Sequence, residues 1–411
     1  MSYPLSNRVQ KYLKRDLMNH PLVKGAMKCA SSVYSKENQE GFINLGTAMS
    51  DLNNDKLYDR VMVRPKFPVT YFKYGDSNGT PKLLQAFKEL LEDHMGCVDV
   101  NVDHISMCSG CGVGVSIVCQ AVTDVGDGVL VPVPCYSGFD FDLFNCDVNL
   151  VRFKLSNLEK LTDEYLQENK IKALLLTNPD NPMGTVIERE ELVKIVNWCQ
   201  EKEIHLISDE IYALEVFDPE KKFVSVMSIK VEKPELVTMV YGLSKDFCIP
   251  GWRTGVIYSK NEQLMNVVKQ SSFYSSLSKD TMLSIEQLLC NHEFRDNWIT
   301  NNRKMIHKQY LKVTKMLDNA EVPYAKSTSA FFFCLDLRKF LKEPERGEIS
   351  EIELHDFLLD NYHVQILAGM GGFYFAEPGW FRMCYALEWE IMETAMERLI
   401  KGLNEYLNTE K

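Results

Sequence analysis

The stretch Tyr241–Gly255, YGLSKDFCIPGWRTG, decides the fold of this chain. It lies between two apolar runs, residues 236–240 and 256–258, which are typical of buried strands. The stretch is therefore expected to form a loop between two strands, and it carries Lys245 and Arg253. A lysine beside buried strands loses hydration, which favours its neutral, nucleophilic form. A neutral amine near a fixed cation suits Schiff-base chemistry on an aldehyde that bears a phosphate.

A second passage of interest is glycine-rich, SGCGVG at residues 109–114. An apolar run leads through these small residues into a helical pattern, an arrangement that presents unpaired backbone N–H groups to an anion. A dinucleotide fingerprint would require glycine at position 115, where Val115 stands, so we reject a nicotinamide site. The Cys-x-x-Cys spacing of Cys108 and Cys111 is compatible with redox or zinc chemistry. We favour the anion site because the glycine-rich loop suits it better.

The segment from Ile171 to Glu210 alternates two apolar runs with a helical pattern. This alternation predicts a βαβ unit and a parallel sheet. The first run ends in the turn NPDNPMG at 178–184, and the second ends at Asp209. Ligands of open α/β sheets bind at the carboxyl ends of the strands. A carboxylate buried there is costly unless a cation meets it, so Asp209 predicts a cationic ligand.

Composition excludes several other classes of protein. A chain of 411 residues exceeds the usual single domain, so we expect one large and one smaller domain. The net charge of −11, without a basic block, argues against nucleic acid and anionic membranes as partners. No apolar run approaches the roughly 20 residues of a membrane span, and the first residues lack the apolar core of a signal peptide. The twelve scattered cysteines suit reduced, buried thiols. We expect a cytoplasmic protein without a metal site.

Taken together, the motifs resemble those of the fold type I pyridoxal-phosphate enzymes, the aspartate aminotransferase superfamily. Within it they are similar to the branch of 1-aminocyclopropane-1-carboxylate (ACC) synthases and their animal ACC-synthase-like relatives. The resemblance runs from about residue 42 to residue 386. The motifs that carry it are Ser-Lys-Asp with Pro-Gly-Trp-Arg at 244–253, Tyr-x-x-x-x-Gly-x-Pro at 74–81, Pro-x-Tyr at 134–136, Asn-Pro-x-Asn-Pro-x-Gly at 178–184, Asp-x-x-Tyr at 209–212 and Gly-Trp-Phe-Arg at 379–382.

The resemblance implies the fold class and the assembly. The fold is expected to be α/β, with a large, doubly wound, mostly parallel sheet domain over residues 50–310. A smaller α/β domain would be built from both ends of the chain, 1–49 and 311–411. Periodicity further predicts two long helices, 262–291 and 293–318. Family members are typically homodimers with shared active sites, so a homodimer is implied.

The resemblance also implies roles for single residues. Lys245 would bind pyridoxal 5'-phosphate through its amine and, once freed by the substrate, remove the α-proton. Asp209 would keep the ring nitrogen protonated, Tyr212 would tune the ring hydroxyl, and Tyr136 would stack on the ring. The other expected cofactor contacts are Gly110, Cys111, Gly112, Asn181, Ser244 and Arg253. The expected substrate contacts are Arg382, which would hold the α-carboxylate, Ala48 and Asn181.

The reaction itself is less determined by the sequence. The resemblance implies an α-amino acid substrate and transamination or a related lyase reaction, passing through an external aldimine and a quinonoid. ACC synthesis from S-adenosylmethionine is the alternative. Against it, Met49 stands where plant-type enzymes carry an acidic residue, and Ser77 stands where they carry a tyrosine. A weakly active cofactor-binding protein is a third possibility, because residues 110–112 lack hydroxyl groups and Gly242 replaces a serine that relatives often carry.

Overall fold

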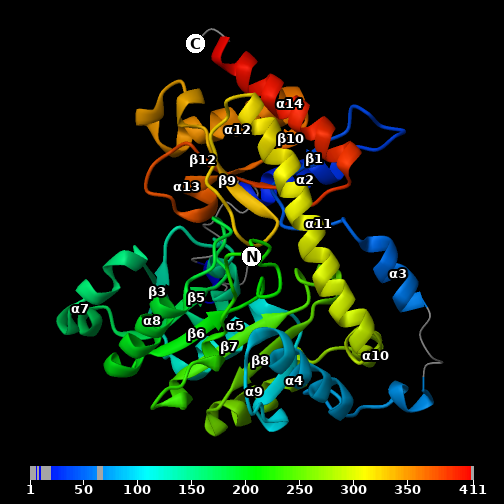
Figure 1. Ribbon diagram of the computed structural model, residues 1–411. Coiled ribbons are helices and arrows are strands. Elements are labelled where there is room, and N and C mark those ends of the chain that lie inside the picture. The colour runs from blue at the N-terminus through cyan, green and yellow to red at the C-terminus, as the bar shows by residue number, and fades with distance from the viewer. Residues whose placement is uncertain (1–5, 7–8, 11–19, 63–67, 409–411) are drawn as a thin grey trace, which may run out of the picture. The chain divides into compact units, whose positions relative to one another are not determined.

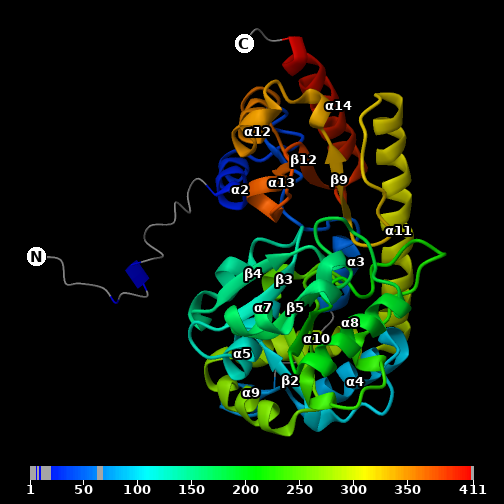
Figure 2. The same ribbon diagram turned by 90° about the vertical axis from the view of Figure 1, so that its left-hand side faces the viewer.

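The computed structural model describes residues 6, 9–10, 20–62 and 68–408. The chain forms two compact units (Figures 1 and 2). The larger unit comprises residues 49–311 and 327–331. The smaller unit comprises residues up to 48, 312–326 and from 332 onward.

The larger unit is built on a seven-stranded sheet in the order β2-β8-β7-β6-β5-β3-β4. Neighbouring strands run parallel except at β8, which is antiparallel to β7 and to β2. Every residue of β6, β7 and β8 is buried, as expected for a sheet covered by helices on both faces. The predicted large, mostly parallel α/β sheet is thereby confirmed. The strands are β2 (Ile105–Cys108), β3 (Gly128–Pro132), β4 (Asn149–Phe153), β5 (Ile171–Thr177), β6 (His205–Asp209), β7 (Val237–Gly242) and β8 (Gly255–Ser259).

The helices of the larger unit follow from local signals in the sequence. In α4 (Pro81–Met95), the Thr80 side chain accepts a hydrogen bond from the Leu83 N–H at 3.1 Å, and Gly96 ends the helix in the left-handed conformation. Its apolar stripe, which includes Phe87 and Leu90, is buried in the core of the unit. The other helices are α3 (Asn54–Met62), α5 (Cys111–Val122), α6 (Phe139–Asp142), α7 (Asp163–Glu168) and α8 (Arg189–Lys202).

One predicted helix is wrong. Residues 262–291 form two helices, α9 (Glu262–Ser275) and α10 (Lys279–Leu289), rather than one. The break occurs because Ser276 and Ser278 adopt extended backbone conformations, and the Ser278 side chain caps α10 by accepting a hydrogen bond from the Thr281 N–H at 3.0 Å. The second long helix is present as α11 (His292–Asn319).

In the smaller unit, segments from both ends of the chain pair with each other. Strand β1 (Ile43–Asn44) lies parallel to β10 (Val364–Gln365). A three-stranded antiparallel sheet, β11-β12-β9, joins β11 (Leu367–Ala368), β12 (Trp380–Cys384) and β9 (Phe332–Asp336). The helices are α2 (Pro21–Ser31), α12 (Glu348–Tyr362), α13 (Gly369–Phe373) and α14 (Trp389–Asn408).

A short segment from the late part of the chain groups with the larger unit. Residues 327–331 fall inside the range 311–411 expected for the smaller domain. The Thr328 and Ser329 N–H groups donate to the Gly184 carbonyl at 2.9 Å each, and the Ala330 N–H donates to the Glu215 carbonyl at 3.2 Å. These bonds attach the segment to the loops that follow β5 and β6.

Within 20–62 and 68–408, no helix combines the length and the apolar character required to cross a membrane. Over the same part of the chain, histidine, cysteine, aspartate and glutamate side chains nowhere form a group of three or more that could hold a metal ion.

Candidate active site

The loop that carries Lys245 is anchored by hydrogen bonds made by the lysine backbone and by the residue after it. Its neighbour Asp246 accepts a bond from the Tyr241 hydroxyl at 2.8 Å, and the indole N–H of Trp298 donates to the Asp246 carbonyl at 2.8 Å. The Cys248 N–H donates to the Lys245 carbonyl at 2.9 Å. The backbone that presents Lys245 is therefore fixed by contacts to β7 and to α11.

Arg253 lies against the beginning of α5. It follows the short helical turn Pro250–Trp252 and adopts the left-handed conformation, with φ of 50°. A Cβ atom on Gly110 would lie 2.5 Å from a terminal nitrogen of Arg253, and Gly110 itself has φ of 102°. Glycine is thus required at position 110 for its backbone angle and for the approach of the guanidinium. The N-terminal N–H groups of α5 and a guanidinium share one corner, which suits a phosphate.

Two residues that sequence reasoning missed lie at the same corner. A Cβ atom on Gly112 would be 2.2 Å from Oδ1 of Asp142, so this carboxyl group packs against the first turn of α5. Burial raises the pKa of Asp142 to about 6, and the charge of Arg253 opposes that rise. Ser109 donates its hydroxyl to the Ser275 carbonyl at 2.7 Å. Ser109 directly precedes the glycine turn, and this position could have suggested it, whereas no local signal in the sequence marks Asp142.

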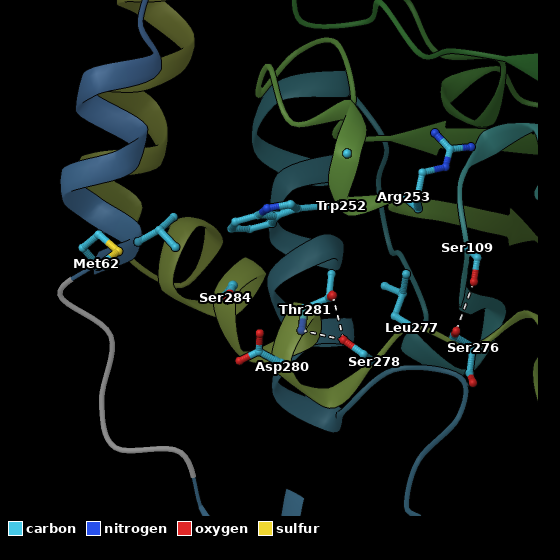
Figure 3. Close-up of a pocket in the computed structure, with 12 residues that line it drawn as sticks. Met62, Ser109, Trp252, Arg253, Ser276, Leu277, Ser278, Asp280, Thr281 and Ser284 are labelled. Atoms are coloured by element: carbon cyan, nitrogen blue, oxygen red, sulfur yellow. Dashed lines mark hydrogen bonds between the residues drawn. The ribbon is translucent and has the colours of Figure 1, made fainter. Parts of the chain in front are cut away.

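A pocket of about 630 Å³ opens beside Arg253 and Ser109. Figure 3 shows Trp252, Arg253 and Ser109 among its lining residues, together with a group of hydroxyl side chains. These hydroxyls come from the α9–α10 break and from α10. The hydroxyl-bearing residues that line the pocket are Ser109, Ser276, Ser278, Thr281 and Ser284. The corner therefore has hydroxyl groups near it although residues 110–112 have none.

Asp209 is the last residue of β6 and only 7% exposed. Among the described residues, its Oδ1 atom has no hydrogen-bond partner. Burial raises the pKa of Asp209 to about 7, the charge of Asp142 adds to the rise, and the Ile211 N–H and Lys245 oppose it. A buried carboxyl oxygen without a partner fits a ligand that brings a cationic N–H, such as a protonated pyridine nitrogen.

The other predicted ring contacts follow strands that neighbour β6. Tyr136 comes after β3, where its ring packs edge-on against Phe139 at 5.4 Å. Asn181 is buried in the turn after β5, and the Asn178 N–H ties this turn to the Asp209 carbonyl at 3.0 Å. Tyr212 is buried after β6. Because β3, β5, β6 and β7 are adjacent and parallel, the structure brings these residues and Lys245 to one edge of the sheet.

Cys111 occupies space beside Gly242. A Cβ atom on Gly242 would lie 2.7 Å from the Cys111 sulfur and 2.3 Å from the Thr254 carbonyl oxygen. Ser244, the other predicted contact of this loop, is 9% exposed. Burial raises the pKa of Cys108 to about 12, which makes this thiol a poor redox group and disfavours the Cys-x-x-Cys alternative.

Arg382 and Ala48, the predicted substrate contacts, belong to the smaller unit. Arg382 lies on β12 and is 2% exposed, with its guanidinium over the rings of Phe332 and Phe373 at 5.0 and 4.8 Å. It donates to the Gly46 carbonyl. Ala48, two residues after Gly46 in the chain, is buried. The guanidinium is thus held in a fixed orientation by aromatic rings and a backbone carbonyl.

The chain is similar in sequence to known enzymes. The family described as aminotransferase class I and II matches residues 43–399. ACC synthase 6 of Arabidopsis thaliana is 33% identical over 388 residues, covering 88% of this chain and 78% of the relative. An ACC synthase of Glycine max is 31% identical over 396 residues, covering 89% and 81%.

Solved structures share the fold. Aspartate aminotransferase of Thermus thermophilus, with maleate, superposes with a TM-score of 0.79 at 20% identity, over 98% of this chain and all of the other. An aromatic aminotransferase of Pyrococcus horikoshii superposes with a TM-score of 0.74 at 20% identity, over 93% of this chain and 99% of the other. The chain therefore belongs to the class I and II aminotransferases and is an enzyme of the aminotransferase or lyase type that depends on pyridoxal phosphate.

Proposed function

We propose that this enzyme uses Lys245 to transfer the amino group of an α-amino acid, or to catalyse a related lyase reaction on it. The observation that carries the proposal is the position of Asp209 at the carboxyl end of β6 and of Lys245 just after the adjacent parallel strand β7, where the charge of Lys245 acts on Asp209. Asp209 has a buried oxygen that forms no hydrogen bond with any described residue. The charge of Lys245 lowers the pKa of Asp209 and so opposes the effect of burial. Pyridoxal chemistry requires a lysine amine to bind the cofactor and a nearby carboxylate to stabilise its protonated ring, and Lys245 and Asp209 provide both groups.

The cofactor-binding residues divide into two groups. The phosphate would be held by the backbone at Gly110–Gly112, by Ser244 and by Arg253, where helix N–H groups and a guanidinium meet. Tyr136 would pack on the ring, and Asn181 and Tyr212 would bind its hydroxyl. When bound, the pyridoxal group supplies an electron sink for the α-carbon.

The remaining roles concern the substrate and its protons. Arg382 would bind the α-carboxylate through two parallel N–H···O bonds, and Ala48 would border the substrate. The amine of Lys245 would act first as a general base, taking the proton from the α-carbon, and then as a general acid, giving the proton to another atom of the bound substrate or cofactor. Asp209 would hold its negative charge opposite the ring nitrogen throughout.

ACC synthesis is the second candidate, and the names of the sequence relatives favour it. Two observations weigh against it. Met49 is uncharged and 44% exposed, so it supplies no carboxylate for a sulfonium. Ser77 is bonded through its hydroxyl to the Ser272 hydroxyl at 2.6 Å, and it is too short to replace a tyrosine that reaches a partner subunit.

The two candidates are separated by a direct assay. Purified protein is incubated with common α-amino acids plus a keto-acid acceptor, and separately with S-adenosylmethionine. We expect keto-acid formation from at least one amino acid and little ACC. Robust ACC production with negligible transamination would establish the second candidate. Absence of both products, with cofactor bound, would indicate the weakly active binding protein instead.

We further propose that the enzyme is a cytoplasmic homodimer. Large apolar side chains are exposed on α9 and before α4: Phe273 is 90%, Phe72 81% and Tyr74 107% exposed. Such side chains are typical of surfaces that a second subunit covers. Sedimentation analysis is expected to give twice the chain mass, and a monomer at micromolar concentration would contradict it. Cell fractionation tests the location.

A further inference from the structure

The backbone carbonyl that accepts a bond from Arg382 belongs to a turn built by one side chain. Gly46 and Thr47 follow β1, and both of their N–H groups donate to Oδ1 of Asn44 at 2.9 Å. The amide nitrogen of Asn44 donates in turn to the Thr47 hydroxyl at 2.9 Å. Backbone N–H groups can only donate, so the atom that faces them is the amide oxygen, and the orientation of the Asn44 side chain is fixed. An asparagine bonded to the backbone two residues later is a common way to fix a tight turn.

The bond to Thr47 sets the direction of the Gly46 carbonyl. The Gly46 C=O and the Thr47 N–H belong to one planar trans peptide unit, in which the two groups point in opposite directions. Asn44 accepts from the N–H end of this unit, and the C=O end accepts from a terminal nitrogen of Arg382. Asn44 and Arg382 are therefore linked through a single rigid peptide unit.

The position of Gly46 is fixed by packing. Gln365 of β10 is 1% exposed, and a Cβ atom on Gly46 would lie 2.9 Å from Cδ and from Nε2 of its side chain. The Gln365 amide cannot withdraw toward α2, because a Cβ atom on Gly25 would lie 2.2 Å from the same nitrogen. Leu45, the residue before Gly46, donates to the Gln365 carbonyl at 2.9 Å and accepts from the Cys384 N–H at 2.8 Å. These contacts hold Gly46 in place and leave the direction of its carbonyl to the side-chain bond described above.

The direction of the Gly46 carbonyl matters for the guanidinium of Arg382. A guanidinium binds a carboxylate through two parallel N–H···O bonds, which requires a defined orientation of its planar fork. The contacts of Arg382 with the rings of Phe332 and Phe373 are attractive but only weakly directional. A hydrogen bond to a carbonyl is strongly directional, so the bond to Gly46 fixes the rotation that the rings leave open. All of these residues belong to the smaller unit.

We propose that Asn44 is a positioning residue for Arg382, which acts through the Gly46–Thr47 peptide unit and sets the affinity of the enzyme for the α-carboxylate of its substrate. Without the Asn44 side chain, two backbone N–H groups lose their acceptor, and the peptide unit can turn its carbonyl away from the guanidinium. Binding of the amino acid then weakens, while the reaction of the bound amino acid continues. The inference rests on the proposed role of Arg382 in holding the carboxylate.

The first test does not depend on substrate binding. Hydrogen exchange of the backbone amides is followed by mass spectrometry in the purified wild type and in Asn44→Ala, without added amino acid. In peptides that contain residues 43–48, we expect exchange in the variant to be faster by about fivefold or more, because two N–H groups lose their acceptor. Exchange in the rest of the smaller unit should stay as in the wild type. Equal exchange of residues 43–48 in both proteins would overturn the inference, whatever Arg382 binds.

The second test measures the affinity for an amino acid. The cofactor spectrum of the holoprotein is titrated with the common α-amino acid that changes the wild-type spectrum most. Asn44→Ala should raise the dissociation constant by about five- to tenfold, with a rate at saturating amino acid within about twofold of the wild type. In an Arg382→Lys background the same change should have no further effect, because its action passes through the guanidinium.

The outcomes of this test separate two kinds of failure. An unchanged constant in Asn44→Ala, or equal effects in the two backgrounds, would refute the positioning role of Asn44 and leave the proposed role of Arg382 intact. A constant that Arg382→Lys alone does not change would refute the role of Arg382 itself, and the inference would fall with it.

Two further variants distinguish positioning from general damage. Asn44→Ser keeps an acceptor oxygen near the turn, so its affinity should lie between those of Asn44→Ala and the wild type. If Asn44→Ala does not fold, Asn44→Ser takes its place, and wild-type affinity there would contradict the inference. Asn38→Ala is the matched control, since Asn38 is also half-buried and donates to the Ser32 hydroxyl and the Val33 carbonyl at 3.0 Å each. It should bind the amino acid normally, and a loss equal to that of Asn44→Ala would count against the inference.

Discussion

The sulfur of Cys111 lies 2.7 Å from the point where a side chain on Gly242 would begin. Both residues depart from what relatives usually carry, a hydroxyl residue in the phosphate turn and a serine three residues before the lysine. In this chain the cysteine fills the volume that the absent serine side chain would occupy. The two departures are thus spatially coupled, and the space beside the phosphate corner remains filled.

The first prediction concerns this packing. Gly242→Ser should destabilise the protein by about 1–3 kcal/mol, because its Cβ atom would lie 2.7 Å from the Cys111 sulfur and 2.3 Å from the Thr254 carbonyl oxygen. The free energy of unfolding in urea measures the effect. Gly251→Ser is the matched control, since a Cβ atom there meets nothing within 4 Å. Equal stability of the two variants would show that the space beside Cys111 is open.

The second prediction concerns the charge opposite the ring nitrogen. Asp209→Asn should leave the cofactor bound but slow removal of the α-proton by orders of magnitude, because a neutral pyridine ring is a poor electron sink. Exchange of the substrate α-hydrogen with deuterated water, followed by NMR, measures this step alone. Asp218→Asn, a change near the surface, should exchange at the wild-type rate. Unaltered exchange in Asp209→Asn would exclude the assigned role.

The third prediction is a pH dependence of the protein without cofactor. Burial raises the pKa of Asp209 from 3.8 to about 7 in the folded state, so the folded chain binds this proton more tightly than the unfolded chain. Its contribution to stability is therefore fully present below pH 4 and is lost as the pH rises towards 7, by up to about 4 kcal/mol. Thermal unfolding of wild type and Asp209→Asn from pH 4 to 8 measures it. The difference in unfolding temperature between the wild type and Asp209→Asn should change with pH over that window. If the Asp209 carboxyl has an ordinary pKa, this difference should not vary with pH.

The fourth prediction concerns the substrate carboxylate. Arg382→Lys should weaken amino-acid binding about tenfold or more, because a lysine cannot form two parallel bonds to a carboxylate. Titration of the cofactor spectrum with substrate measures the dissociation constant. Arg398→Lys, in which the guanidinium that binds the Gly41 carbonyl at 2.8 Å is replaced, is the control and should bind substrate normally. An unchanged constant in Arg382→Lys would mean that another group holds the carboxylate.

The sequence was most informative where a motif and a strand end coincide. Lys245, Asp209 and Asn181 could be placed at the ends of strands from local pattern alone, because each follows an apolar run. Which strands are neighbours depends on pairing between distant segments, and local periodicity does not reveal that order.

Residues without a local signal were missed. Asp142 lies on a four-residue helix, and nothing in its surroundings marks it as a neighbour of Gly112. Glu215 follows the Asp-x-x-Tyr motif by three positions, and its carbonyl accepts a bond from the Ala330 N–H, a contact with a distant segment that local pattern does not reveal. The break between α9 and α10 was missed because the apolar spacing continues across it, while the capping role of Ser278 is set by a single hydrogen bond.

The central claim is that Lys245 carries the cofactor. Reduction of the purified holoprotein with borohydride, followed by proteolysis and mass spectrometry, locates the pyridoxyl group on the chain. The account predicts a single modified lysine, Lys245, and no modification in Lys245→Arg treated identically. A pyridoxyl group on another lysine, or a purified protein that binds no pyridoxal phosphate, would contradict it.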